Sequence, residues 1–242
     1  MAYLGELELK LSIIIPIYNE YHNIDEVINR INSVILPDEI SGLEMVLVDD
    51  GSIDGTATKL EKYKNINKMI IHESRLNFGK GTATRVGLTY VTGDIVLIQD
   101  ADLEYDPNDY PKLLAPIINR EADIVYGSRF LNQKKRLKGM ALKNWFINII
   151  LRVMTNILYG SHLTDEATAY KMFKTDIIKK IDLKSKRFEF CPEVTAKILK
   201  MGCKIIEVPI SYQGRTVEEG KKIRWYDGID AIWTLLKYRF VD

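Results

Sequence analysis

Carboxylates occur at every second position directly after an apolar run near the middle of the chain. The stretch 93–107 reads GDIVLIQDADLEYDP, and Asp100, Asp102 and Glu104 project to one side if the segment is extended. Carboxylates this close repel one another unless a positive group lies between them. Hard divalent cations such as Mg²⁺ or Mn²⁺ take oxygen ligands, usually one or two carboxylates together with substrate phosphates. We therefore predict that these three residues bind a divalent metal ion that holds a diphosphate.

Short apolar runs rich in Ile and Val recur through the first half of the chain and must position these carboxylates. They are continuous rather than alternating, which is typical of strands buried on both faces. Helical patterns lie between them, so we predict an α/β fold with a doubly wound, mostly parallel sheet, helices on both faces and right-handed crossovers. The runs are LSIIIPIY (11–18), EMVLVDD (44–50), KMIIHE (68–73), DIVLIQD (94–100) and ADIVYGS (122–128).

Polar clusters follow three of the predicted strands. Glu20 follows the first strand, Asp50 the second and Asp100 the fourth. Ligands of such sheets bind beyond the carboxyl ends of the strands, so we expect one acidic mouth there. The alternative is that Asp, Asn and Gly at strand ends only make turns and cap helices, and we favour it for Asp54 and Asn23.

Composition excludes several classes of protein. Lys and Arg number 34 against 33 for Asp and Glu, and a formal net charge of +1 gives no reason to expect nucleic-acid binding. Cys191 and Cys203 lie in no CxxC or Cys/His cluster, so zinc is not indicated and a reducing cytoplasm is the default. Neither a signal peptide nor an apolar run of about 18 residues is present, so we expect no membrane span.

Five motifs in order resemble the family 2 glycosyltransferases of the GT-A fold, and most closely the polyprenyl-phosphate glycosyltransferases, which include the dolichyl-phosphate mannose synthases. The resemblance runs from about Leu11 to the late 220s. It implies a catalytic domain over residues 1–222, followed by a C-terminal amphipathic helix over 223–242. The motifs are SIIIPIYNE (12–20), VDDGSIDGT (48–56), NFGKGTATRVGL (77–88), GDIVLIQDADLEYDP (93–107) and YGSRF (126–130).

The resemblance implies roles for the matching positions. Asp100, Ala101 and Asp102 form the DxD element, with Asp100, Asp102 and Glu104 as metal ligands for Mg²⁺ or Mn²⁺. Glu104 departs from the mannose synthases, which often carry Gln there. Arg129 corresponds to an arginine that contacts donor or acceptor phosphate, for which a guanidinium offers fixed bidentate donors. The residues implied to line the nucleotide pocket are Pro16, Tyr18, Glu20, Val48 and Asp50.

Two later segments match the family in part. Residues 163–173, LTDEATAYKMF, keep Asp165 as a candidate acceptor-side residue, although three other family positions differ. Arg215 and Lys221 match positions that close over the donor and acceptor phosphates, with Lys222 as a substitute for Lys221.

The resemblance implies inverting transfer of a sugar from a nucleotide diphosphate donor, such as GDP-mannose or a UDP-hexose. A hydroxyl acceptor requires a carboxylate base, whereas a lipid monophosphate is already ionised. Hydroxyl-directed members usually carry an acidic pair where this chain has only Glu189 and Glu193, so we favour a polyprenyl phosphate acceptor. A hydroxyl acceptor in polysaccharide synthesis and a non-catalytic sugar-nucleotide-binding subunit are the alternatives.

A lipid acceptor requires a surface that faces a membrane. Residues 144–159 are dense in large apolar side chains, and 223–240 place Trp225, Ile229 and Trp233 near one helical face, with basic residues around it. Such helices lie in a bilayer interface without crossing it. The alternative is that they pack on the sheet or on a second subunit. We expect peripheral attachment to the cytoplasmic face of a membrane, with a membrane-anchoring partner or a homodimer as further partners.

Overall fold

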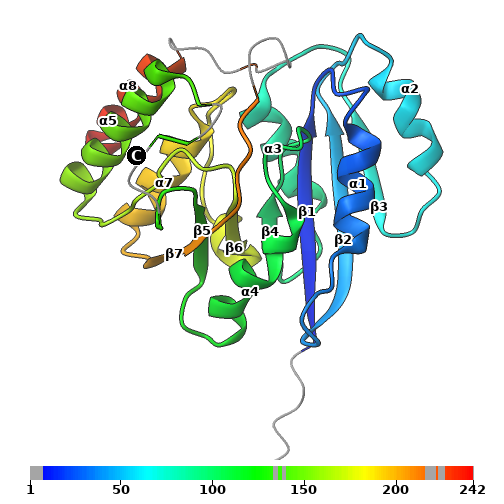
Figure 1. Cartoon of the computed structure of the whole chain (residues 1–242), viewed down its shortest axis with the longest axis horizontal. Coiled ribbons are helices and arrows are strands. Elements are labelled where there is room, and N and C mark those ends of the chain that lie inside the picture. Colours follow the sequence, from blue (N-terminus) through cyan, green and yellow to red (C-terminus); the bar gives the residue numbers. More distant parts are fainter. Residues whose placement is uncertain (1–7, 133–135, 138–139, 216–221, 223–226, 242) are drawn as a thin grey trace, which may run out of the picture.

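The computed structural model describes residues 8–132, 136–137, 140–215, 222 and 227–241. Within these ranges the strands form one seven-stranded sheet in the order β3-β2-β1-β4-β6-β5-β7 (Figure 1). Only β6 runs antiparallel to its neighbours β4 and β5. The strands are β1 Leu9–Ile17, β2 Ile40–Asp49, β3 Met69–Glu73, β4 Ile95–Ile98, β5 Ile124–Ser128, β6 Lys171–Lys174 and β7 Ile205–Pro209.

The prediction of a mostly parallel α/β sheet is confirmed, and the five apolar runs coincide with β1 to β5. Helices cover both faces of the sheet. They are α1 Ile24–Ser33, α2 Thr56–Leu60, α3 Lys80–Tyr90, α4 Tyr110–Ile118, α5 Leu142–Tyr159, α6 Thr175–Ile178, α7 Phe190–Lys200 and α8 Asp227–Phe240. The 3₁₀ turns η1 Glu61–Tyr63 and η2 Pro107–Asp109 complete the elements.

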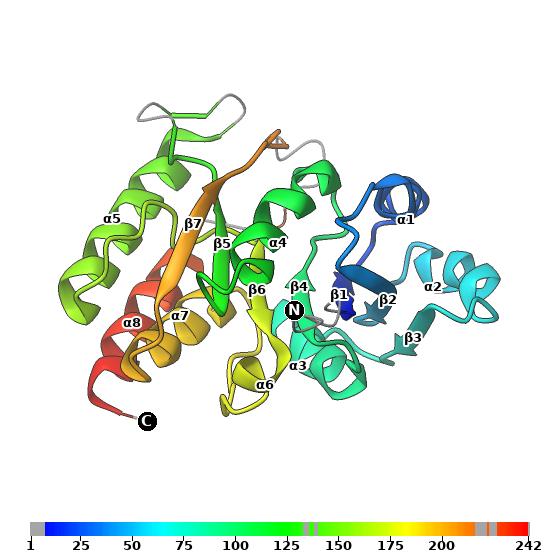
Figure 2. The ribbon, with the colours of Figure 1, turned by 90° about the horizontal axis from the view of Figure 1, so that it is seen from below.

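Successive residues of each strand face opposite layers of the core. Ile13 and Ile15 pack with α1 and α4 on one face, while Ile14 packs with α3 and α7 on the other. Both faces are therefore apolar, which explains the continuous apolar runs. Figure 2, which looks from below, shows α5 and α8 beside α7 at the β7 end of the sheet.

The C-terminal helix α8 packs on the rest of the fold through one face. Ala231, Leu235 and Tyr238 are buried against Leu151 of α5 and Ala196 of α7. The opposite face exposes Ile229, Trp233 and Phe240. Trp225 lies outside the described residues. Among the described residues, no helix has the length and apolarity to cross a bilayer.

Antiparallel β6 determines which segment lies at the carboxyl edge of the parallel strands. Its first residues pair with the ends of its neighbours, Met172 with Leu97 of β4 and Lys171 with Tyr126 of β5. The segment that enters β6, residues 163–170, therefore lies at the carboxyl edge of the parallel strands. This edge also carries the loops that follow β1, β2 and β4.

Candidate active site

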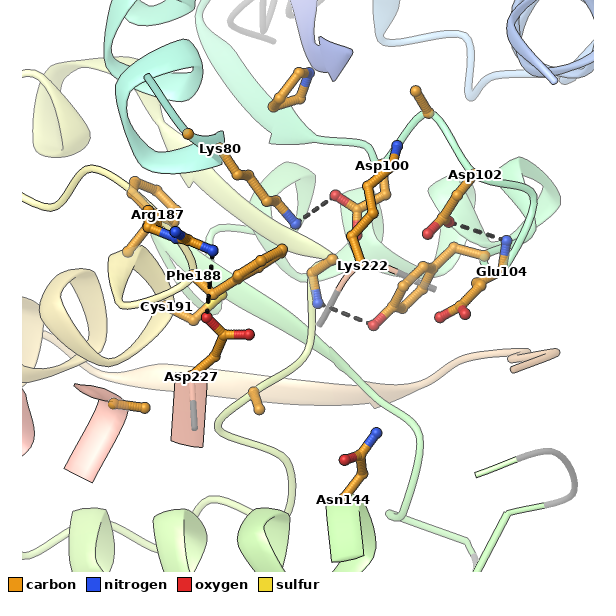
Figure 3. A pocket seen from close by; sticks show the side chains of 18 of the residues that line it. Lys80, Asp100, Asp102, Glu104, Asn144, Arg187, Phe188, Cys191, Lys222 and Asp227 are labelled. Atoms are coloured by element: carbon orange, nitrogen blue, oxygen red, sulfur yellow. Dashed lines mark hydrogen bonds and ion pairs between the residues drawn. The ribbon is translucent and has the colours of Figure 1, made fainter. Parts of the chain in front are cut away.

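A cavity of about 340 Å³ opens at the carboxyl edge of the sheet. The loops after β1, β2 and β4 form one wall, and the starts of α7, α8 and α5 form the other (Figure 3). We call its charged part the acidic mouth, formed by Glu20, Asp100, Asp102 and Glu104. The three strand ends thus converge as predicted from the sequence.

Most residues predicted for the nucleotide pocket line this cavity, namely Pro16, Tyr18, Glu20 and Asp50. Val48 does not line it, because its side chain is fully buried between the sheet and α3. The Asp50 carboxylate accepts the backbone N–H groups of Phe78 (2.9 Å) and Gly79 (2.6 Å). Burial raises the pKa of Asp50 in spite of these two bonds, which favour the ionised form.

A basic side chain contacts each aspartate of the DxD element. Lys80 forms an ion pair with Asp100, and Arg215 Nη2 donates to Asp102 Oδ2 at 2.8 Å. Burial, together with the charges of Asp100 and Glu104, raises the pKa of Asp102 to about 7, although Arg215 opposes the shift. The mouth therefore has a high density of negative charge that Lys80 and Arg215 only partly offset.

Two glycines place Lys80 at the cavity. Gly79 has φ +97°, and a Cβ there would lie 2.5 Å from the carbonyl oxygen of Lys186. A Cβ on Gly81 would lie 2.7 Å from the carbonyl oxygen of Ser185. This close approach lets Gly81 N donate to the Arg187 carbonyl at 3.1 Å, which fixes the start of α3 against the 185–187 loop.

The segment 212–215 closes the mouth from the C-terminal side. The Glu104 carboxylate accepts Tyr212 OH at 2.7 Å and the backbone N–H of Arg215 at 2.8 Å. Arg215 also reaches Glu20 at 3.4 Å, and Lys222 Nζ donates to the same carboxylate at 2.6 Å. Lys222 therefore contacts the mouth, whereas Lys221, the position predicted first, lies outside the described residues.

Arg129 and Asp165 form a buried pair beside the cavity. Arg129 lines the cavity, but its Nε and Nη2 donate to the two oxygens of Asp165 at 2.6 and 2.7 Å. Asp165 lies behind Arg129 and does not line the cavity. In this arrangement Arg129 holds Asp165, and contact of either residue with phosphate or acceptor stays a prediction.

The opposite wall includes residues that the sequence analysis did not single out. Arg187 lies 3.7 Å from Asp227 between their charged atoms, and Asn144 of α5 faces the cavity from the far side (Figure 3). Neither residue belongs to one of the five motifs, so no local signal identified them. Lys80, by contrast, lies inside the quoted motif NFGKGTATRVGL.

An apolar wing extends the cavity away from the acidic mouth. It is lined by Met140, Ile147, Leu151 and Ala231, which come from α5, α8 and the segment before α5. Glu189 and Glu193, the candidate bases, do not line the cavity. Glu193 accepts the backbone N–H groups of Lys184 and Ser185, and Glu189 accepts those of Lys186 and Arg187.

Residues 12–182 match the family model described as Glycosyl transferase family 2. The chain belongs to this family. The family prediction is thereby confirmed, and the matched range contains all five motifs that carried it.

Curated relatives of this family 2 chain include enzymes named for polyprenyl phosphates. It is 28% identical over 209 residues to dodecaprenyl-phosphate galacturonate synthase of Rhizobium johnstonii, covering 86% of this chain and 60% of the relative. It is 33% identical over 216 residues to UDP-N-acetylglucosamine--dolichyl-phosphate N-acetylglucosaminyltransferase of Methanococcus voltae, and the match covers 82% of this chain and 83% of the relative. It is 27% identical to undecaprenyl-phosphate mannosyltransferase of Micrococcus luteus, and the match covers 96% of this chain and 99% of the relative. The chain thus spans less than two thirds of the first relative and nearly all of the last.

Solved structures support the fold. Glucosyl-3-phosphoglycerate synthase of Mycobacterium tuberculosis, in complex with Mn²⁺, UDP and phosphoglyceric acid, superimposes with a TM-score of 0.72 at 16% identity. The match covers 97% of this chain and 80% of that one. At this identity the comparison establishes the shared GT-A architecture.

The donor set of the mouth suits a divalent ion that shares its coordination with phosphate. Among the described residues, no group of three or more His, Cys, Asp or Glu is arranged to hold a metal by itself. Asp100 and Asp102 would supply the one or two carboxylates that Mg²⁺ takes when phosphates complete its ligands, and this assignment stays a prediction. The Glu104 carboxylate instead holds Tyr212 and Arg215, so its predicted role as a ligand stays a prediction.

Proposed function

We propose that this protein is a metal-dependent inverting glycosyltransferase that moves a sugar from a nucleotide diphosphate donor to a polyprenyl phosphate. Membership of family 2 and the names of the curated relatives support the class of reaction. The observation that carries the choice of acceptor is the cavity, which joins the acidic mouth and its cations to an apolar wing. A phosphate-headed lipid has the matching division into a charged end and an apolar chain.

The state of the candidate bases favours a phosphate acceptor over a hydroxyl. A hydroxyl must lose a proton to a positioned base, whereas a phosphate oxygen is already ionised near neutral pH. Glu189 and Glu193 both hold the 184–187 loop through backbone N–H groups, and Glu193 is fully buried. Neither carboxylate is available at the cavity wall for proton removal.

The proposed reaction needs no net proton transfer. An oxygen of the lipid phosphate forms a bond to the anomeric carbon of the sugar, the bond from that carbon to the donor diphosphate breaks, and the nucleoside diphosphate leaves. Asp100 and Asp102 would hold the divalent ion, which neutralises charge that grows on the leaving diphosphate. Arg215 and Lys80 lie beside these carboxylates and would contact the phosphates.

A membrane surface is the proposed source of the acceptor. Helix α5 exposes an apolar stripe at helical spacing, and α8 exposes Trp233. An apolar helix face of this kind rests in a bilayer interface, where the chain of a polyprenyl phosphate also lies. The stripe is formed by Leu142, Phe146, Ile150, Val153 and Ile157.

A transfer assay tests the proposed function. GDP- and UDP-sugars are offered with Mn²⁺ against a polyprenyl phosphate and, in parallel, against the corresponding free polyprenol. We expect product only on the phosphate, and the donor that reacts identifies the base and the sugar. Product on the free alcohol, or donor binding without transfer to either lipid, would contradict the lipid-phosphate acceptor.

A further inference from the structure

The two carboxylates of the DxD element are held by cations from different parts of the fold. Lys80 comes from the start of α3 and pairs with Asp100. Arg215 comes from the segment after β7 and donates to Asp102 at 2.8 Å. Each cation contacts the carboxylate oxygens that a divalent ion would need, so cation and metal compete for the same atoms.

Arg215 is fixed at its backbone but incompletely bonded at its guanidinium. Its backbone N–H donates to Glu104 at 2.8 Å, which anchors the residue. Its contacts with Glu20 are long, at 3.4 Å, and its buried Nε has no hydrogen-bond partner among the described residues. A buried N–H without an acceptor is costly, and a phosphate oxygen would satisfy it.

The charge of the site favours joint binding of metal and diphosphate. Four carboxylates, Glu20, Asp100, Asp102 and Glu104, face three cations, Lys80, Arg215 and Lys222. A divalent ion alone would place its charge beside these cations, and a diphosphate alone would face the carboxylates. Because the charges of a divalent ion and a diphosphate nearly cancel, their joint entry preserves the balance of the site.

We propose that Lys80 and Arg215 act as exchangeable counter-ions, which occupy Asp100 and Asp102 until the diphosphate of a donor takes over both cations. The carboxylates then become free for the metal, so metal and diphosphate each bind weakly alone and tightly together. This inference rests on the proposed function, since it concerns the same donor site. It adds Lys80 as a phosphate-binding residue. It also gives Arg215 a second role, as the counter-ion of Asp102 before the donor binds.

The expected coupling follows from competition. If Asp102 is free of Arg215 in about a tenth of the molecules, the apparent affinity for metal alone falls about tenfold. Coupling is reciprocal, so the factor by which a diphosphate tightens Mn²⁺ binding equals the factor by which Mn²⁺ tightens diphosphate binding.

Mn²⁺ binding without acceptor or turnover tests the exchange. The EPR signal of free Mn²⁺ is titrated with the whole chain, alone and with UDP or GDP, and a protein-free titration corrects for Mn²⁺ held by the nucleotide. We expect Arg215→Gln to bind Mn²⁺ alone on the order of tenfold more tightly than the wild type, while the tightening by nucleotide shrinks by a similar factor. Lys80→Met is expected to resemble Arg215→Gln. It should bind Mn²⁺ alone more tightly than the wild type and show a smaller tightening by nucleotide.

Two further variants separate competition from general charge effects. Arg30→Gln removes the same charge from the exposed Arg30–Glu26 pair of α1, and we expect Mn²⁺ binding like that of the wild type. Arg215→Lys keeps a cation and is expected to lie between the wild type and Arg215→Gln. Melting curves verify that each variant is folded.

Two results would overturn the exchange. If Arg215→Gln binds Mn²⁺ alone no more tightly than Arg30→Gln, there is no competition, although transfer by the wild type would still support the proposed function. If the wild type binds neither Mn²⁺ nor nucleotide in any combination, the donor site is absent, and the proposed function fails with it.

Discussion

Arg129 and Asp165 form a bidentate ion pair that joins the end of β5 to the segment before β6. The Asp165 carboxylate also accepts the backbone N–H of Arg129 at 3.0 Å, and both side chains are more than nine-tenths buried. Asp165 N in turn donates to Glu207 of β7 at 2.9 Å. The guanidinium carbon lies 5.0 Å from the centre of the Tyr212 ring, so the pair supports the segment that closes the acidic mouth.

Asp165→Asn is expected to lower the free energy of unfolding by about 3–5 kcal/mol, because it leaves the charge of Arg129 buried without its partner. Urea unfolding measures this change. The matched control is Asp123→Asn, which breaks the exposed pair between Lys174 and Asp123 and should cost less than about 1 kcal/mol. Equal losses in the two variants would mean that the buried pair is not structural.

Gly79→Ala is expected to destabilise the protein and to weaken nucleotide binding. The positive φ strains any side chain, and the added Cβ would press on the carbonyl oxygen of Lys186 at 2.5 Å. Strain alone costs about 1–3 kcal/mol, and movement of the loop would also break the bonds that hold Asp50. Thermal melting and nucleotide titration measure the two effects.

Gly202→Ala provides the control for backbone strain. Gly202 has φ +75°, but a Cβ there would meet no atom within 4 Å. We expect a smaller loss of stability than for Gly79→Ala and unchanged nucleotide binding. Similar behaviour of the two variants would contradict a special role for the contact between Gly79 and the 185–187 loop.

The parallel strands could be predicted because the sequence signal of each strand lies within one short continuous segment. A continuous apolar run such as 94–100 carries its own signal, and the carboxylates after it are next in the chain. Strand β6 was not predicted, because KMFK is short and begins with Lys171, which is buried and lies over the Tyr126 ring at 3.8 Å. No periodic pattern marks a buried lysine whose neighbours come from another strand.

The pairings inside the site could not be predicted for the same reason. The sequence indicated Arg129 as a phosphate contact, but no motif or spacing shows that Asp165 accepts hydrogen bonds from its Nε and Nη2. Asn23 was expected to cap α1, yet its side chain makes no cap and donates instead to Glu20 at 2.7 Å. Such choices depend on three-dimensional neighbours, whereas motif and periodicity record only neighbours along the chain.

Acid should remove a stabilising contribution from Glu44. Burial would raise the pKa of this carboxyl, but hydrogen bonds from Lys10, Ser12 and Thr92 outweigh it and lower the pKa from 4.5 to about 2. A lowered pKa in the folded state stabilises the protein above the unfolded value, and this stabilisation is lost as the pH falls from about 4.5 to about 2. The size of the shift limits the contribution to about 3 kcal/mol.

Glu44→Gln tests this contribution through unfolding measured across pH. We expect the wild type to be more stable than the variant near neutral pH and the difference to shrink as the pH falls through that window. Glu26→Gln removes an exposed carboxylate from α1 and should show little difference at any pH. A difference for Glu44→Gln that does not depend on pH would assign the effect to packing.

The apolar stripe on α5 should bind lipid vesicles. Phe146→Glu combined with Ile150→Glu places two charges on this face and should weaken vesicle binding by about 10- to 100-fold. Each side chain is about half exposed, so its insertion contributes about half of the 1.5–3 kcal/mol that full burial of a large apolar side chain gives. Co-sedimentation with anionic vesicles measures the binding of the wild type and the variant. Ile53→Glu is the control, since Ile53 is 85% exposed and precedes α2 at the opposite end of the sheet (Figure 1). If the control weakens binding as strongly, the stripe is not the membrane surface.

Asp102→Asn should abolish transfer while leaving the fold intact. The neutral amide cannot serve a divalent ion as the carboxylate does, and loss of such stabilisation costs roughly 10²–10³-fold or more in rate. Stability should change little, because burial already disfavours the ionised form of Asp102 and raises its pKa to about 7. Chelation of divalent metal should abolish transfer reversibly. The control is Asp106→Asn, which lies four residues further along the chain and outside the cavity lining and should retain activity. Full activity of Asp102→Asn, or of the wild type after chelation, would contradict the proposal that Asp102 holds a divalent metal ion.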